Sequence, residues 1–196
     1  MAVSKTRQHL VDVARQLFAK KGVQDTTMND IAVASKKGRR TLYTYFQSKE
    51  DVYFAVIETE LELLSDTMRK VAAKNISPDE KILELVYTHL DAIKEVVYRN
   101  GTLRAGFFRD IWKVEHARKN FDKTEVEIFH AILQEAREGG VFMLDEASVP
   151  VYADILHYCV KGIEVPYIRG RIGNGLDRQL VKRYVKRIVY GALERI

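Results

Sequence analysis

Residues 26–52 read TTMNDIAVASKKGRRTLYTYFQSKEDV and predict two short helices joined by a tight turn. Two threonines open the stretch and suit the cap of a helix whose first turn carries Asp30, an acid near the positive end of that helix. Residues 35–38 have little helix signal and end in glycine, so the chain is predicted to turn there. A second helix, rich in arginine, threonine and tyrosine, is predicted from Arg39 to Phe46.

The second short helix has a polar surface that is large for its length. Leu42 and Phe46 lie four residues apart on one face and are predicted to pack against the rest of the domain. The other side chains are left to hydrogen-bond with groups outside the helix. Two short helices joined by a turn of three or four residues, the second exposing donors and aromatics, are typical of a helix-turn-helix that reads DNA.

The second helix is predicted to enter the major groove of double-stranded DNA. Arg39 and Arg40 can bind guanine O6 and N7 bidentately, with Thr41 and Thr44 assisting, and the other polar groups suit phosphate oxygens. The predicted DNA-binding residues are Thr27, Lys37, Arg39, Arg40, Thr41, Tyr43, Thr44, Tyr45 and Lys49. The alternative is a solvated basic face, the usual role of a run of charges, but hydroxyl and aromatic side chains are interleaved with the basic ones here.

The distribution of charge also favours a nucleic-acid partner for this end of the chain. The 196 residues carry a formal net charge of +5. Residues 1–50 hold ten Lys or Arg against four Asp or Glu, whereas the rest of the chain holds 22 against 23. Because a phosphate-binding surface needs positive charge to release counterions from DNA, the excess coincides with the predicted reader.

These residues resemble the TetR family of bacterial transcriptional regulators. The similarity covers residues 5–52 and consists of an apolar first helix, Gly-x-x-x-Thr-Thr (22–27), Asp-Ile-Ala (30–32) and Thr-Leu-Tyr-x-Tyr-Phe-x-Ser-Lys-Glu (41–50). The chain departs from the family pattern in the turn, where Lys36 and Lys37 replace the usual glycine and apolar residue. It departs again where Gly38-Arg39-Arg40 replaces Ser-Lys-Gly.

The resemblance implies an all-α protein with an N-terminal three-helix helix-turn-helix domain, residues 1–48. A larger helical domain, residues 49–196, is expected to bind an effector and to dimerise through its last two helices. The function implied is that of a ligand-responsive repressor, not an enzyme, which binds a palindromic operator as a homodimer and is released by a small molecule. The alternative is a ligand-independent architectural or partner-recruiting dimer that binds DNA.

Composition agrees with a helical, soluble and cytoplasmic protein. Three prolines, no Pro-rich or Ser-rich linker and no strong strand alternation favour helices. No apolar run approaches the roughly 20 residues that a membrane span needs, and no signal peptide is recognisable. The single cysteine, Cys159, excludes an intramolecular disulfide and is predicted to be buried and inert. We expect no cofactor.

Apolar residues at helical spacing predict the remaining elements. The predicted helices are 4–21, 48–74, 77–100, 121–138, 148–168 and 176–196. In the helix 148–168 the side with Ile155, Leu156 and Cys159 is predicted to be apolar. Because the last two helices have broad apolar faces, they can pair with their copies across a two-fold axis.

Bulky aromatic residues between 80 and 165 are candidates for the wall of an effector pocket. The predicted ligand-binding residues are Tyr87, Phe107, Phe108, Trp112, Phe129 and Tyr158. In the TetR family such a pocket binds a small, often hydrophobic, molecule.

A helical metalloprotein or enzyme is the other interpretation, because Glu127 precedes His130, and Asp154 precedes His157, at the Glu-x-x-His spacing of bundle metal sites. With 27 acids and five histidines in the chain, we expect this spacing to arise by chance and predict no metal site and no catalytic residue.

Overall fold

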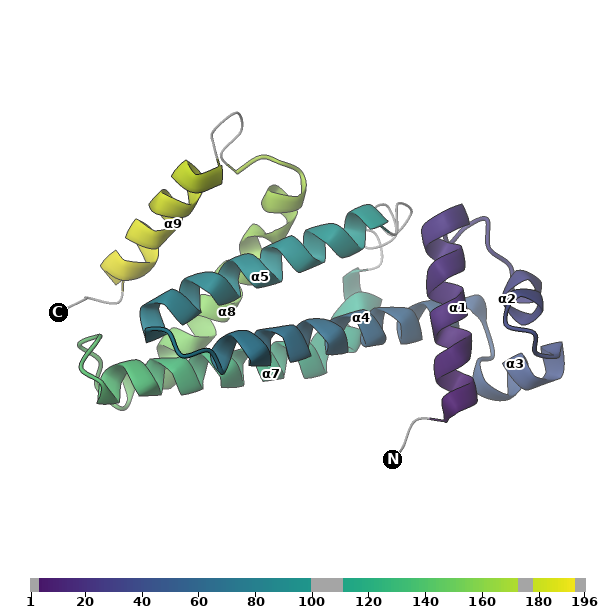
Figure 1. Cartoon of the computed structure of the whole chain (residues 1–196), viewed down its shortest axis with the longest axis horizontal. Helices are drawn as coiled ribbons and strands as arrows, with labels where there is room; N and C mark the ends of the chain where they lie inside the picture. Colours follow the sequence, from purple (N-terminus) through teal and green to yellow (C-terminus); the bar gives the residue numbers. More distant parts are fainter. Residues whose placement is uncertain (1–3, 100–110, 173–177, 193–196) are drawn as a thin grey trace. The chain divides into compact units, whose positions relative to one another are not determined.

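A computed structural model of the protein describes residues 4–99, 111–172 and 178–192 (Figure 1). The regular elements of these ranges are the helices α1 (Lys5–Lys21), α2 (Met28–Ala34), α3 (Arg39–Tyr45), α4 (Lys49–Ala72), α5 (Pro78–Arg99), α7 (Ile111–Glu138), α8 (Ser148–Ile168) and α9 (Arg178–Ala192). The all-α fold predicted from the sequence is confirmed. None of the helices described is both long and apolar enough to cross a lipid bilayer.

The chain groups into two compact units. The first comprises residues 1–62 and 95–119, and the second comprises residues 63–94 and 120–196. Three long helices, α4, α5 and α7, contribute residues to both units. The boundary after residue 48, expected from the sequence, remains a prediction.

In the first unit, the two short helices α2 and α3 lie beside the longer α1 (Figure 1). A single apolar core joins them to the beginning of α4, and its buried members are Leu10, Val11, Ala14, Phe18, Ile31, Ala32, Leu42, Phe46, Val52, Ala55 and Val56. Each fully buried large apolar side chain stabilises the fold by about 1.5–3 kcal/mol relative to an exposed one. This core therefore fixes the positions of α2 and α3.

Reciprocal caps begin two helices of the first unit, and the threonine cap of α2 is the one predicted from the sequence. The amide N–H of Asp30 donates to Thr27 Oγ1 at 3.1 Å, and the amide N–H of Thr27 donates to Asp30 Oδ2 at 2.9 Å. Ser48 and Asp51 form the same box at the start of α4, at 3.0 and 3.1 Å. The hydrogen bonds from Thr27 lower the pKa of Asp30, and nearby Lys21 adds to this effect. Caps of this kind contribute about 1 kcal/mol each.

The turn between α2 and α3 passes through a left-handed residue. Lys36 has a φ of 55°, whereas Gly38, two residues later, has a φ of −65°. The amide of Lys37 donates to the carbonyl of Ala32 at 3.1 Å and closes the end of α2. The lysine that replaces the family's glycine thus takes the one strained position of the turn.

Two predictions about the helices α7 and α8 were wrong. Helix α7 begins at Ile111, ten residues before the predicted start at Phe121, because the polar stretch before Phe121 contains no helix breaker. Helix α8 has the predicted bounds, but its buried residues are Val149, Ala153, His157, Val160, Glu164 and Ile168. Cys159, expected to be buried, is exposed, because it lies on the opposite side of α8 from this buried row.

We expect Lys36→Gly to raise the free energy of unfolding by about 0.5–1 kcal/mol, because glycine adopts a positive φ without steric cost. Lys36→Val should lower it by about 1–2 kcal/mol, since a β-branched residue is strained there. Urea unfolding followed by circular dichroism measures both changes. Lys37→Gly is the matched control. A gain in stability for that variant as large as for Lys36→Gly would contradict the assignment of the backbone strain to Lys36.

Candidate nucleic-acid interface

Leu42 and Phe46, with half-buried Tyr45 packed against the same core, attach α3 to the first unit and leave much of its surface in solvent. Leu42 and Phe46 are buried, whereas Arg39, Arg40 and Tyr43 are exposed. The Nε2 atom of His9 in α1 lies 3.1 Å from the carbonyl oxygen of Ser35, which ties the turn to α1. The core and α1 thus hold the helix-turn-helix on its buried side. The exposed side of α3 is rich in hydrogen-bond donors.

The two arginines at the start of α3 differ in their surroundings. The Arg39 Nε–H donates to Oδ1 of Asn29 in α2 at 2.9 Å. Arg40 takes part through its carbonyl oxygen, which accepts from the Thr44 hydroxyl at 2.9 Å. Thr41, the other predicted assisting residue, is half-buried. Both guanidinium groups remain accessible to a ligand outside the protein.

The residues predicted to bind phosphate lie around the same surface. Lys37 and Tyr43 are exposed, and the Thr27 hydroxyl belongs to the α2 cap. The Tyr45 hydroxyl lies 3.0 Å from Ser4 Oγ, and the Lys49 ammonium donates to the carbonyl oxygen of Gln24 at 3.1 Å. These last two side chains therefore already support the fold of the first unit. That each of the nine predicted residues contacts DNA remains a prediction.

This arrangement is chemically suited to a duplex. An exposed short helix that begins with two arginines can present bidentate donors to base edges, while the lysine and tyrosine groups around it can bind backbone oxygens. The sequence profile described as "Bacterial regulatory proteins, tetR family" matches residues 10–56, which contain α2, α3 and most of α1.

The chain belongs to the TetR family.

Relatives along most of the chain agree with this assignment. The HTH-type transcriptional regulator QacR of Staphylococcus aureus is 22% identical over 145 residues, which cover 72% of this chain and 76% of QacR. The HTH-type transcriptional repressor KstR2 of Mycobacterium tuberculosis is 24% identical over 197 residues, which cover 97% and 94%. The solved structure of a TetR/AcrR-family regulator from Thermobifida fusca aligns with a TM-score of 0.64 at 25% identity, covering 96% of this chain and 98% of that one.

This TetR-family protein is therefore a DNA-binding regulator of transcription and not an enzyme. Its relatives are named as regulators and repressors, which agrees with the predicted regulator and not with an architectural dimer.

The predicted pocket residues of the TetR-family protein lie in different surroundings. Tyr87 in α5 and Phe129 in α7 are buried, and Tyr158 in α8 is 67% exposed. Phe107 and Phe108 lie outside the described residues, as does the side chain of Trp112. Tyr87 lines a groove of about 780 Å³ between α5 and α9. The groove has carboxylates on α5 and basic groups on α9, and its lining residues are Ile76, Glu80, Leu83, Glu84, Tyr87, Thr88, Asp91, Lys182, Arg183 and Lys186.

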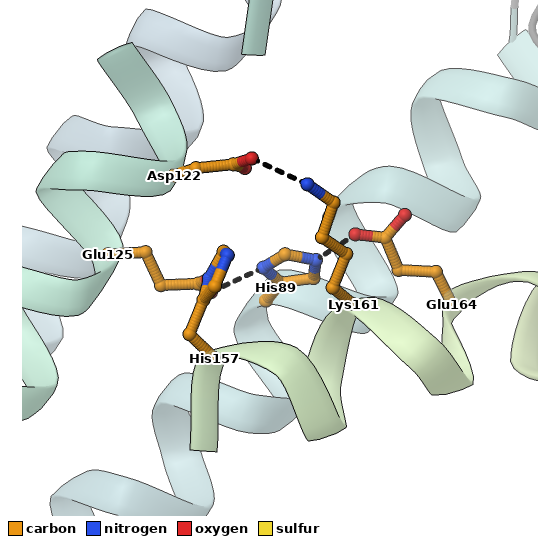
Figure 2. Close-up of polar contacts among 6 residues, drawn as sticks. All are labelled: His89, Asp122, Glu125, His157, Lys161 and Glu164. Carbon is orange, nitrogen blue, oxygen red and sulfur yellow. Dashed lines mark hydrogen bonds and ion pairs between the residues drawn. The ribbon is translucent and has the colours of Figure 1, made fainter. Parts of the chain in front are cut away.

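A cluster of buried charged groups links three helices of the second unit (Figure 2). His89 in α5 donates from Nδ1 to Glu125 Oε1 in α7 at 2.5 Å, and from Nε2 to Glu164 Oε1 in α8 at 2.7 Å. The other oxygen of Glu125 accepts from His157 Nδ1 in α8 at 2.6 Å. Beside them the Lys161 ammonium donates to Asp122 Oδ2 at 2.7 Å.

The charges in this cluster stabilise one another. Burial opposes the charged form of His89, but hydrogen bonds to Glu125 and Glu164 raise the pKa of His89 to about 9. Burial alone would raise the pKa of Glu125, yet hydrogen bonds from His157 and His89 hold it below its usual range. Removing one partner of such a buried set typically costs about 3–5 kcal/mol, because the other charge is left unpaired.

This cluster was not predicted from the sequence, although Glu125 gave a signal. Glu125 follows the spacing of buried Phe121, Ile128 and Ile132, and Glu164 continues the buried row of α8. Ionisable residues at core positions indicate partners inside the protein. No group of three or more histidine, cysteine or carboxylate residues within the described part of the chain is arranged to hold a metal ion.

Stability should fall as pH rises from about 6.5 to about 9, because His89 is more basic in the folded chain than its ordinary value of 6.5. A pKa that is raised by folding stabilises the fold fully below pH 6.5. This stabilisation is lost as the pH rises through the pKa of His89 in the folded chain. Urea unfolding at several pH values measures the slope, and His89→Gln should remove this part of it.

His130→Gln, which changes an exposed histidine of α7, is the control and should keep the slope. An NMR titration of the His89 imidazole in the wild-type protein checks the same point directly. Loss of its proton near pH 6.5 would contradict the assignment.

Proposed function

We propose that this protein is a ligand-responsive repressor that binds a palindromic operator as a homodimer. Regulators of the TetR family bind DNA operators as dimers and respond to small-molecule effectors. The observation that carries the proposal is the exposed, arginine-led surface of α3, which buried Leu42, half-buried Tyr45 and the following Phe46 hold to the core. As a regulator of transcription, the protein would act in the cytoplasm, where bacterial DNA lies.

The DNA contacts divide into two kinds. Arg39 and Arg40 would read bases, with Thr41 and Thr44 assisting. The side chains that would bind phosphates are Thr27, Lys37, Tyr43, Tyr45 and Lys49. Phosphate contacts position the protein on the duplex, whereas base contacts select the sequence.

Dimerisation through α8 and α9 would supply the second reading helix. Val151, Ile155 and Tyr158 form an exposed apolar row on α8, and Tyr184 and Ile188 do the same on α9. Apolar rows of this kind are typical of protein interfaces. Two reading helices related by a two-fold axis would contact half-sites about one DNA turn, roughly 34 Å, apart.

The effector would act on residues 49–196 by a population shift. A small molecule that binds better to a form with a different spacing of reading helices weakens operator binding by its differential affinity. Tyr87 on the α5 and α9 groove and buried Phe129 are the described members of the proposed aromatic set that remain candidates for its contacts. A melting scan against a metabolite library would find a ligand, since ligands of the native state raise its melting temperature.

Selection of duplexes from a random pool at moderate salt tests the operator proposal. A recovered palindrome with fixed half-site spacing would support it. Recovery of no preferred sequence, with binding that disappears as salt rises, would leave only a nonspecific basic surface.

Arg40→Ala should lower discrimination between the operator and single-base variants by about 1–3 kcal/mol, because a bidentate base contact is lost. Lys37→Ala should weaken binding to all sequences alike and reduce its salt dependence, since a phosphate contact is lost. Fluorescence anisotropy titrations at several salt concentrations measure both. An equal loss of affinity on every sequence for both variants would contradict the division into base-reading and phosphate-binding residues.

Ile188→Glu should convert the dimer into monomers at micromolar concentration, because a charge would be buried in the proposed interface. Ile188 is 73% exposed in the isolated chain, so the substitution should leave the protomer folded. Sedimentation velocity measures the change. Val33→Glu, at a 70% exposed apolar residue of α2, is the control and should remain dimeric. An unchanged dimer for Ile188→Glu would exclude this part of α9 from the interface.

A further inference from the structure

The bond between Asn29 and Arg39 joins the two helices of the helix-turn-helix on their exposed side. Arg39 is the first residue of α3 and Asn29 is the second residue of α2. The Nε–H of Arg39 donates to Asn29 Oδ1 at 2.9 Å, and both side chains are exposed. We infer that Asn29 determines operator specificity by holding Arg39 in the orientation in which it reads a base pair. This inference rests on the proposed reading of bases by Arg39.

The acceptor on α2 is firmly placed. The reciprocal cap of Thr27 and Asp30 encloses Asn29 on both sides in the chain, so the first turn of α2 is fixed. Ile31 and Ala32 then bury the same helix in the core. Because the backbone around Asn29 is anchored and its side chain is short, Asn29 Oδ1 is confined to a small region, against which the longer side chain of Arg39 can be oriented.

The bond uses a guanidinium donor that guanine reading can spare. A guanidinium group is planar and carries five N–H donors, one on Nε and four on the two terminal nitrogens. With Nε–H bound to Asn29, the plane of the group is oriented and both terminal nitrogens remain able to donate. Two parallel donors are what guanine O6 and N7 require for bidentate recognition.

Holding the side chain before binding should also strengthen discrimination. An arginine side chain loses rotamer freedom when it is fixed on a base, and this loss opposes binding. A side chain already restrained by Asn29 loses less, and it is less able to turn toward an alternative base or a phosphate. Asn29 is therefore a positioning residue, which acts on the operator through Arg39.

A double-mutant cycle on the selected operator tests the inference. Affinities of wild type, Asn29→Ala, Arg39→Ala and the double variant are measured for the operator and for each single base-pair change, at one salt concentration. Arg39→Ala should lose about 10- to 100-fold of the preference at one base pair of each half-site. Asn29→Ala should lose roughly 5-fold at that same base pair, and the double variant should lose no more than Arg39→Ala.

Two further variants separate positioning from a general effect. Asn29→Asp keeps an acceptor for Nε–H, so it should retain the base preference while its negative charge weakens binding to all sequences. Lys37→Ala should leave the preference at the Arg39 base pair unchanged. The free energy of unfolding of Asn29→Ala, measured in urea, should equal or exceed that of the wild type, since alanine has a higher helix propensity than asparagine.

The outcomes distinguish this inference from the proposed function. If Arg39→Ala lowers the preference and Asn29→Ala does not, Arg39 reads the base without help from Asn29, and the inference alone fails. The same holds if Asn29→Ala lowers the preference by an equal factor in the Arg39→Ala background. If Arg39→Ala leaves every preference unchanged, the assignment of base reading to Arg39 fails, and the inference fails with it.

Discussion

Burial of Leu42 and Phe46 is the constraint on which the proposed reading surface depends. A helix of seven residues, such as α3, is too short to be stable in water without tertiary contacts. Its apolar contacts with a core built from α1, α2 and the start of α4 hold it in place, and its remaining positions are thereby released for polar groups. The surface proposed to read DNA is thus available because the core uses only a few residues of α3.

The second unit is organised on a different physical basis. Its helices α5, α7 and α8 meet around buried ionisable groups, in which one imidazolium donates to carboxylates of two other helices (Figure 2). A buried charge set of this kind adds little net stability compared with apolar packing but strongly penalises any arrangement in which a partner is lost. It therefore favours one arrangement of the three helices over slightly shifted arrangements. Such selectivity suits a part of the protein that is proposed to change between discrete states.

Much of the fold could be predicted because the first unit follows simple rules. Caps, a glycine-bounded turn and two apolar residues four apart identified α2 and α3, and the all-helical class followed from periodicity. The side of α8 that is buried could not be predicted in this way, because hydropathy ranks Ile155 and Cys159 above Glu164 and ignores the partners that make burial of Glu164 favourable. The contact of Asn29 with Arg39 was also out of reach, since it depends on the angle between two helices.

The exposure of Cys159 has a practical consequence. It is the single thiol of the chain, and on α8 it neighbours the exposed Tyr158. A thiol-reactive fluorophore would attach at this one position without any engineering of the sequence. Its emission would report, in real time and in a mixture, when another molecule covers or leaves the apolar side of α8.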